Sequence, residues 1–77
     1  AERGRAVYRA AAVRVDAARQ ILAALVRRYG SVNAVARAVA DRHDLPFPTA
    51  QRSLFRIRRG EHPYVSVETY DRLWVLR

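Results

Sequence analysis

Strong helix breakers divide this chain into segments of helical length. They are Gly30, the Pro46-Phe47-Pro48 run and Gly60. Glycine often ends a helix because it adopts a left-handed backbone without steric cost, and proline cannot continue a helix. The chain has 77 residues and no cysteine, so its stability must come from packed apolar faces and not from disulfides or thiolate metal sites. The breakers therefore predict one small domain of short helices.

The segment before Gly30 carries an apolar stripe with the period of a helix, which predicts a helix over residues 16–29. Asp16 is expected to cap its N-terminus, and Gly30 is expected to follow its C-terminus. The stripe consists of Ala18, Leu22, Leu25 and Tyr29, with Ile21 and Val26 beside it.

The next segment predicts a helix over residues 32–42 with Ser31 as its N-cap. Its buried face is expected to hold Val32, Val35, Ala36 and Val39, and its outer face Asn33, Arg37 and Asp41. The third helix is predicted over 48–59, because Pro48 suits a first helical turn and Gly60 ends the pattern. The stripe of the third helix is Phe47, Ala50, Leu54 and Ile57.

Residues 61–65 are predicted as a loop or short extended piece, and Ser66 as the cap of a fourth helix over 66–76. That apolar pattern is still running at Arg77, so we expect the chain to belong to a longer protein or this helix to dock on a partner. Residues 1–15 show no stable period and are predicted as an N-terminal arm or lead-in segment. The predicted fold class is all-α: a four-helix helix-turn-helix domain over 16–77, preceded by that arm.

The charge of the chain favours a polyanionic partner. All fifteen basic residues are arginine, against seven acids, which gives a formal net charge of +8. The arginine side chain presents a planar fork that matches phosphate oxygens and guanine edges. Nucleic acid is the commonest partner of so basic a domain.

The third helix is predicted to read DNA, because the face opposite its apolar stripe carries Arg52, Arg56 and Arg59. The N-terminal end of such a helix usually enters the major groove most deeply. The expected base contacts are Thr49, Gln51, Arg52, Ser53 and Arg56. The expected phosphate contacts are Ser31, Asn33, Arg37, Arg58 and Arg59. Arg3 and Arg5 of the arm are candidates for an adjacent minor groove.

Three segments that together span about half the chain carry a resemblance to a known family: Gly-Ser-Val-Asn-Ala-Val-Ala-Arg at 30–37, Leu-Phe-Arg-Ile-Arg-Arg-Gly at 54–60 and Val-Ser-Val-Glu-Thr-Tyr-Asp-Arg-Leu at 65–73. In these segments the chain resembles the lambda-repressor-like, Cro-like helix-turn-helix family, especially its phage and actinobacterial members. It implies that Ala36 packs at the helix crossing, that Gly60 ends the recognition helix and that the segment at Ser66 opens a supporting helix. It also implies sequence-specific operator binding, often by a repressor.

One departure from the family concerns the turn. The family's turn glycine corresponds to Ala40, and about eight extra residues separate Ala36 from Thr49. Either the second helix is a turn longer or the turn is an enlarged, proline-braced loop. Phe55 lies off the apolar stripe, and we expect it to pack beneath Tyr64 or the fourth helix; contact with a thymine methyl is the alternative.

Other classes of function find little support in the sequence. His43 and His62 lie in separate loops without cysteines or clustered carboxylates, so we expect no enzyme, no cofactor, no metal and no small-molecule substrate. No apolar stretch has the length of a membrane span and no signal peptide is recognisable, which predicts a cytoplasmic, nucleoid-associated protein of a bacterium or phage-infected host.

The alternatives to a repressor are the DNA-targeting domain of a recombinase or transposase and an RNA-binding or protein-interaction module. A homodimer through Tyr70, Trp74 and Leu76 of the fourth helix is a further expectation.

Overall fold

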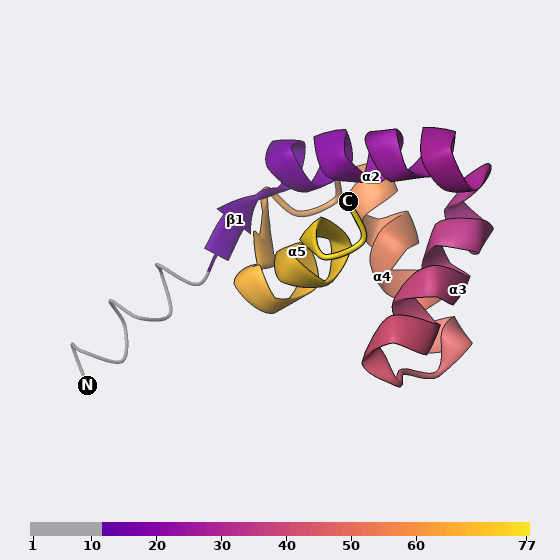
Figure 1. The fold of residues 1–77 in the computed structure, drawn as a ribbon. Helices are drawn as coiled ribbons and strands as arrows, with labels where there is room; N and C mark the ends of the chain where they lie inside the picture. Colours follow the sequence, from indigo (N-terminus) through magenta and orange to yellow (C-terminus); the bar gives the residue numbers. More distant parts are fainter. Residues whose placement is uncertain (1–11) are drawn as a thin grey trace.

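The structure, a computed structural model, describes residues 12–77. Within them it contains four helices and two short strands, which confirms the all-α prediction (Figure 1). α2 runs along one side of the molecule, with α3, α4 and α5 packed beneath it (Figure 1). In chain order the elements are β1 (Ala12–Arg14), α2 (Val15–Tyr29), α3 (Val32–His43), α4 (Phe47–Arg59), β2 (Tyr64–Ser66) and α5 (Val67–Trp74).

One hydrophobic core lies between the helices, and it is built mostly from the predicted stripes, with Ala40 of α3 and Leu73 of α5 in addition. Tyr29 is the exception, because it is 38% exposed at the end of α2. Ala36 is fully buried, as predicted from its place in the apolar stripe of the second helix. The buried residues are Ala18, Ile21, Leu22 and Leu25 of α2, Val32, Val35, Ala36, Val39 and Ala40 of α3, Ala50, Leu54 and Ile57 of α4, and Leu73 of α5.

The predicted glycine stops and serine caps are confirmed. Gly30 and Gly60 both adopt a left-handed backbone, with φ of 104° and 67°. The Ser31 hydroxyl accepts a hydrogen bond from the Ala34 N–H at 3.0 Å, and Ser66 accepts one from Thr69 at 3.2 Å. These caps satisfy backbone donors that a helix leaves without partners in its first turn.

The predicted cap at Asp16 is wrong. α2 begins one residue earlier, at Val15, and its N-cap is Arg14, whose side chain makes no capping hydrogen bond. Asp16 instead lies in the first turn, where a carboxylate favours the positive end of the helix dipole. Its carboxylate lies 3.9 Å from the Arg14 guanidinium.

The turn between α3 and α4 contains a left-handed residue that is not glycine. α3 continues through Ala40 to His43, and Asp44 adopts the left-handed conformation, with φ 53° and ψ 49°. The Asp44 N–H and the Leu45 N–H both bond to the Ala40 carbonyl. α3 therefore ends one residue later than predicted, and residues 44–46 connect it to α4. α4 begins after Pro46, one residue earlier than predicted.

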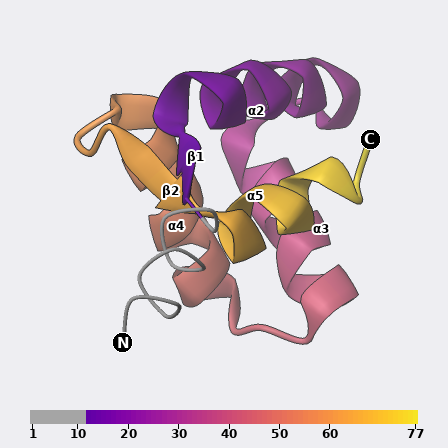
Figure 2. The same ribbon diagram turned by 90° about the vertical axis from the view of Figure 1, so that its left-hand side faces the viewer.

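A two-stranded antiparallel sheet was not predicted. β1 pairs with β2 in the register Ala12 to Ser66, Val13 to Val65 and Arg14 to Tyr64 (Figure 2). The ladder continues in the bond from the Val15 N–H to the Pro63 carbonyl, at 2.8 Å. The end of the predicted lead-in segment therefore belongs to the fold.

The fourth helix is shorter than the predicted span of 66–76. α5 ends at Trp74, and Val75 and Leu76 form a turn. The backbone N–H of Leu76 bonds to the Leu73 carbonyl, which closes this turn. The apolar pattern up to Leu76 reflects packing of that half-buried side chain on the core, and not a continuing helix.

Candidate nucleic-acid interface

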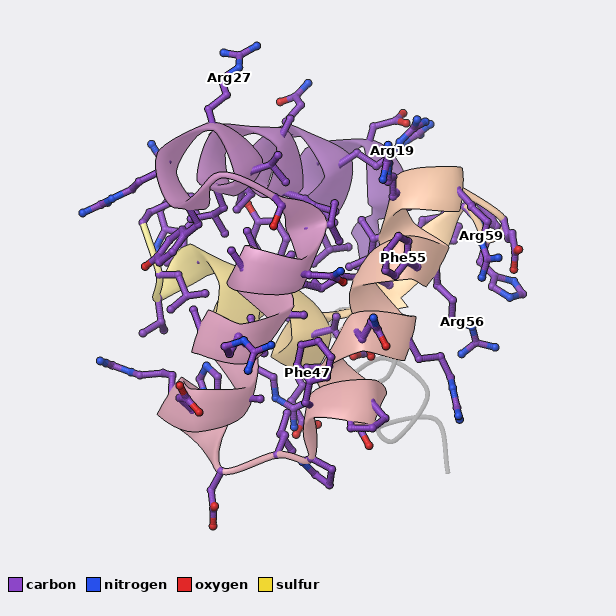
Figure 3. The ribbon with its side chains drawn as sticks, turned by 90° about the vertical axis from the view of Figure 1, so that its right-hand side faces the viewer. Arg19, Arg27, Phe47, Phe55, Arg56 and Arg59 are labelled. Carbon is purple, nitrogen blue, oxygen red and sulfur yellow. The ribbon has the colours of Figure 1, made fainter. Side chains whose placement is uncertain are left out.

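α4 has one buried side and one arginine-bearing side, as predicted. Ala50, Leu54 and Ile57 are each only 2% exposed. Arg52, Arg56 and Arg59 are exposed on the other side of the helix. Figure 3 shows Arg56 and Arg59 extending from α4 away from α3. The core thus fixes the rotation of α4 about its axis.

A hydrogen bond joins the outer faces of α3 and α4. The side-chain amide of Gln51 donates through Nε2 to Oδ1 of Asn33 at 3.1 Å. The bond sets which end of the Gln51 amide faces α3. It leaves Oε1 and the second N–H of Gln51 free for another partner.

Arg37 is also held in place across the two helices. Its guanidinium carbon lies 5.0 Å from the centre of the Phe47 ring, at the start of α4. Phe47 itself is half-buried against the core. A cation over an aromatic face keeps its in-plane N–H donors available. Arg37 thus presents donors beside the N-terminal end of α4.

Ser31 and Arg58 line a shared hollow of about 400 Å³ at the junction of α2, α3 and α4. Arg19 of α2 lines it too, and the sequence did not single out this residue. A Cβ at Gly60 would lie 3.3 Å from Nη1 of Arg19, so this guanidinium sits against the end of α4. The floor of the hollow is apolar and is formed by Leu22, Ala23, Val26 and Val32.

The exposed arginines differ in how far they are neutralised. Nε of Arg59 lies 3.1 Å from the Glu61 carboxylate. Within residues 12–77, neither Arg52 nor Arg56 nor Arg58 forms an ion pair. Their positive charge is therefore fully available to an anion.

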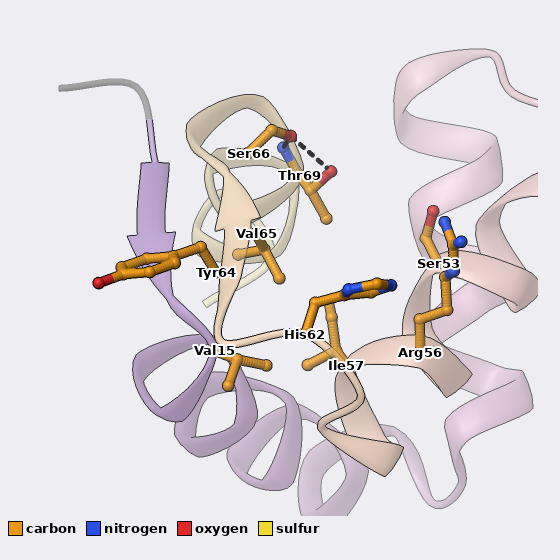
Figure 4. Close-up of a pocket in the computed structure, with 9 residues that line it drawn as sticks. All are labelled: Val15, Ser53, Arg56, Ile57, His62, Tyr64, Val65, Ser66 and Thr69. Atoms are coloured by element: carbon orange, nitrogen blue, oxygen red, sulfur yellow. Dashed lines mark hydrogen bonds between the residues drawn. The ribbon is translucent and has the colours of Figure 1, made fainter. Parts of the chain in front are cut away.

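Two of the predicted contact residues lie at the edges of the outer face. Thr49 is exposed in the first turn of α4. Ser53 is half-buried and lines a second hollow, of about 240 Å³, between α4 and β2 (Figure 4). Arg56 lines the same hollow. The Ser53 side chain therefore lies on the flank of α4 beside this hollow and not at the N-terminal end of the helix.

The expected packing of Phe55 is wrong. Phe55 lies two turns after Phe47 on the same flank of α4 (Figure 3), whereas Tyr64 borders the hollow on the opposite flank (Figure 4). Phe55 is half-buried against the core from that side.

The predicted dimer surface on α5 is partly covered. Tyr70 and Leu76 are half-buried against the core, and Trp74 is 50% exposed. Tyr70 stacks with Trp74 at 6.2 Å between ring centroids. The Arg77 guanidinium lies 4.6 Å from the Trp74 ring.

Three further observations concern metal ligands, membrane-spanning helices and the N-terminal arm. Among residues 12–77, no group of three or more metal-ligating side chains is close enough to hold an ion. None of the helices in that part of the chain is long and apolar enough to cross a membrane. The arm residues Arg3 and Arg5 lie outside the described residues.

No protein-family model matches the chain, and comparisons with curated proteins and with solved structures give no match.

Proposed function

We propose that this protein binds double-stranded DNA sequence-specifically, with α4 in the major groove, and acts as a bacterial or phage transcriptional repressor. The observation that carries the proposal is that α4 has two distinct sides: a stripe buried in the core and an opposite face of exposed arginines, of which Arg52 and Arg56 form no ion pair within residues 12–77. The major groove is about 12 Å wide and admits a helix of about 10–12 Å diameter. Such a protein acts in the cytoplasm, where bacterial DNA lies.

Base reading is assigned to the N-terminal half of α4. The free Oε1 and N–H of Gln51 match the N6 donor and N7 acceptor of adenine. Arg52, one residue later on the exposed side, suits guanine O6 and N7. Thr49 can add a methyl contact to thymine.

Phosphate contacts are assigned to the residues around this half-helix. Asn33 and Arg37 of α3 stand beside the start of α4, and Ser31 and Arg58 flank the junction with α2. Arg59 also faces the backbone, in competition with its partner Glu61. Such contacts position a protein and make its affinity depend on salt.

The experiment is selection from a random duplex library, followed by anisotropy titration of the enriched duplex. We expect one enriched motif whose length and symmetry report whether one or two copies bind. Selection without any enriched motif would contradict sequence-specific binding. If structured RNA competes for the protein as well as the enriched duplex does, an RNA-binding module is favoured instead.

A recombinase or transposase targeting domain would share this DNA binding. The half-exposed Trp74 also supports contact between two copies or with another protein. A symmetric selected motif would support the homodimer, and an asymmetric one would favour a monomer.

A further inference from the structure

The hollow between α4 and β2 gathers polar side chains from separate parts of the chain. Ser53 and Arg56 come from α4, and His62 reaches towards them from the loop after that helix (Figure 4). Thr69 lies across the hollow, on α5. Its volume of about 240 Å³ exceeds the roughly 30 Å³ that a water molecule occupies in the liquid, so an anion such as phosphate fits.

The hollow keeps an unneutralised positive charge because the acids nearby are bound to other arginines. Glu61 pairs with Arg59 at 3.1 Å, and Glu68 pairs with Arg72 at 2.7 Å. In the described part of the chain, Arg56 has no such partner. An anion entering the hollow therefore meets a free guanidinium.

Hydrogen-bond donors are free at the same place. Within residues 12–77, neither the Ser53 hydroxyl nor the His62 ring forms a hydrogen bond. Ser66 donates to the Thr69 hydroxyl oxygen at 2.9 Å, which leaves the hydroxyl hydrogen of Thr69 available. Free donors around a guanidinium suit the oxygens of a phosphate.

We infer that this hollow seats one backbone phosphate of DNA, held by Arg56, His62 and Ser53. The inference rests on the proposed function, because a helix in the major groove has the backbone of one strand on each side. Asn33 and Arg37 lie on one flank of α4, and the hollow lies on the other. Ser53 and Arg56, expected from the sequence to contact bases, thereby become phosphate contacts.

The test is a methylphosphonate scan, in which each phosphate of the selected duplex is replaced in turn by a neutral group. Wild type, Arg56→Ala and His62→Ala are titrated against every duplex, with Arg27→Ala as the charge-matched control. Arg27 is exposed on α2 and points away from α3 and α4 (Figure 3). Circular dichroism checks that each variant is folded.

We expect that methylphosphonate at one position of the duplex lowers the affinity of the wild-type protein about tenfold, as for loss of a charge-assisted hydrogen bond. The same position should have little effect on Arg56→Ala and a reduced effect on His62→Ala. Arg56→Ala should also lower the affinity for the matched duplex and for single-mismatch duplexes by the same factor. Arg27→Ala should behave as wild type.

Two results would overturn the phosphate seat while DNA binding stands. One is relaxed discrimination at a single base pair in Arg56→Ala, which would make Arg56 a base contact. The other is an unchanged methylphosphonate profile in both variants. If wild type binds no duplex above its affinity for random sequence, the proposed function itself fails, which is a separate outcome.

Discussion

The hydrogen bond from Gln51 to Asn33 predicts an energetic coupling between these residues in DNA recognition. Replacing Asn33 by alanine releases the Gln51 amide, which must then be ordered when DNA binds. A hydrogen bond of this kind contributes about 0.5–1.5 kcal/mol net, and fixing a glutamine side chain costs up to about 2 kcal/mol. We therefore expect a coupling free energy of about 1 kcal/mol, or roughly fivefold in affinity.

The assay is a double-mutant cycle by anisotropy, with Asn33→Ala, Gln51→Ala and the double variant on the selected duplex. Gln51→Ala alone should cost about 1–3 kcal/mol and relax discrimination at one A·T pair. Asn33→Ala should also weaken that discrimination when Gln51 is present, but not when Gln51 has been replaced by alanine. Any phosphate contact of Asn33 cancels in the cycle, because it is lost in both backgrounds.

Stability serves as the control for this cycle. Asn33 is exposed and Gln51 half-buried, so each substitution should change the free energy of unfolding in urea by no more than about 0.5 kcal/mol. Additive effects of the two substitutions on binding, within error, would refute the idea that Asn33 orients Gln51.

The remaining predictions concern charge, backbone and core. Arg59→Ala should weaken binding to all DNA sequences alike and reduce the slope of log affinity against log salt concentration by about 0.9. Glu61→Gln should strengthen binding, because it frees Arg59 from its ion pair. Stronger binding by Arg59→Ala or weaker binding by Glu61→Gln in a salt titration would contradict the role of this ion pair. Asp44→Gly should raise the urea midpoint by relieving up to about 1 kcal/mol of left-handed strain; a lower midpoint would contradict that strain. Leu54→Ala should cost about 2–5 kcal/mol of unfolding free energy, and a loss below 1 kcal/mol would show that α4 is not anchored there.

The helices could be predicted from the sequence because their signals are local. The stripe through Ala50, Leu54 and Ile57, and the stops at Gly30 and Gly60, each lie within a few residues of the element they define. The left-handed residue at Asp44 was missed, although aspartate tolerates this conformation better than most residues.

The sheet could not be predicted, because its pairing is between distant segments. Three residues at Ala12–Arg14 are too few to show an alternating pattern, and their partner strand lies near the other end of the described chain. The sequence likewise indicated that α4 has an outward face of arginines, but not on which flank of the helix each residue lies. Ser53, His62 and Arg19 acquire their surroundings only from the way β2 and α2 are placed beside α4 in the folded chain.

Sequence-specific reading by α4 is tested most directly by one comparison of affinities. Wild type, Arg52→Ala and Arg27→Ala are titrated at one salt concentration against the selected duplex and a duplex of the same composition in shuffled order. We predict that wild type prefers the selected duplex by about a thousandfold or more, as specific DNA-binding proteins do. Arg52→Ala should lose about tenfold of this preference, since a bidentate base contact contributes about 1–3 kcal/mol, and Arg27→Ala should keep it. Equal wild-type affinity for both duplexes would contradict the account and leave α4 as a basic surface that reads no sequence.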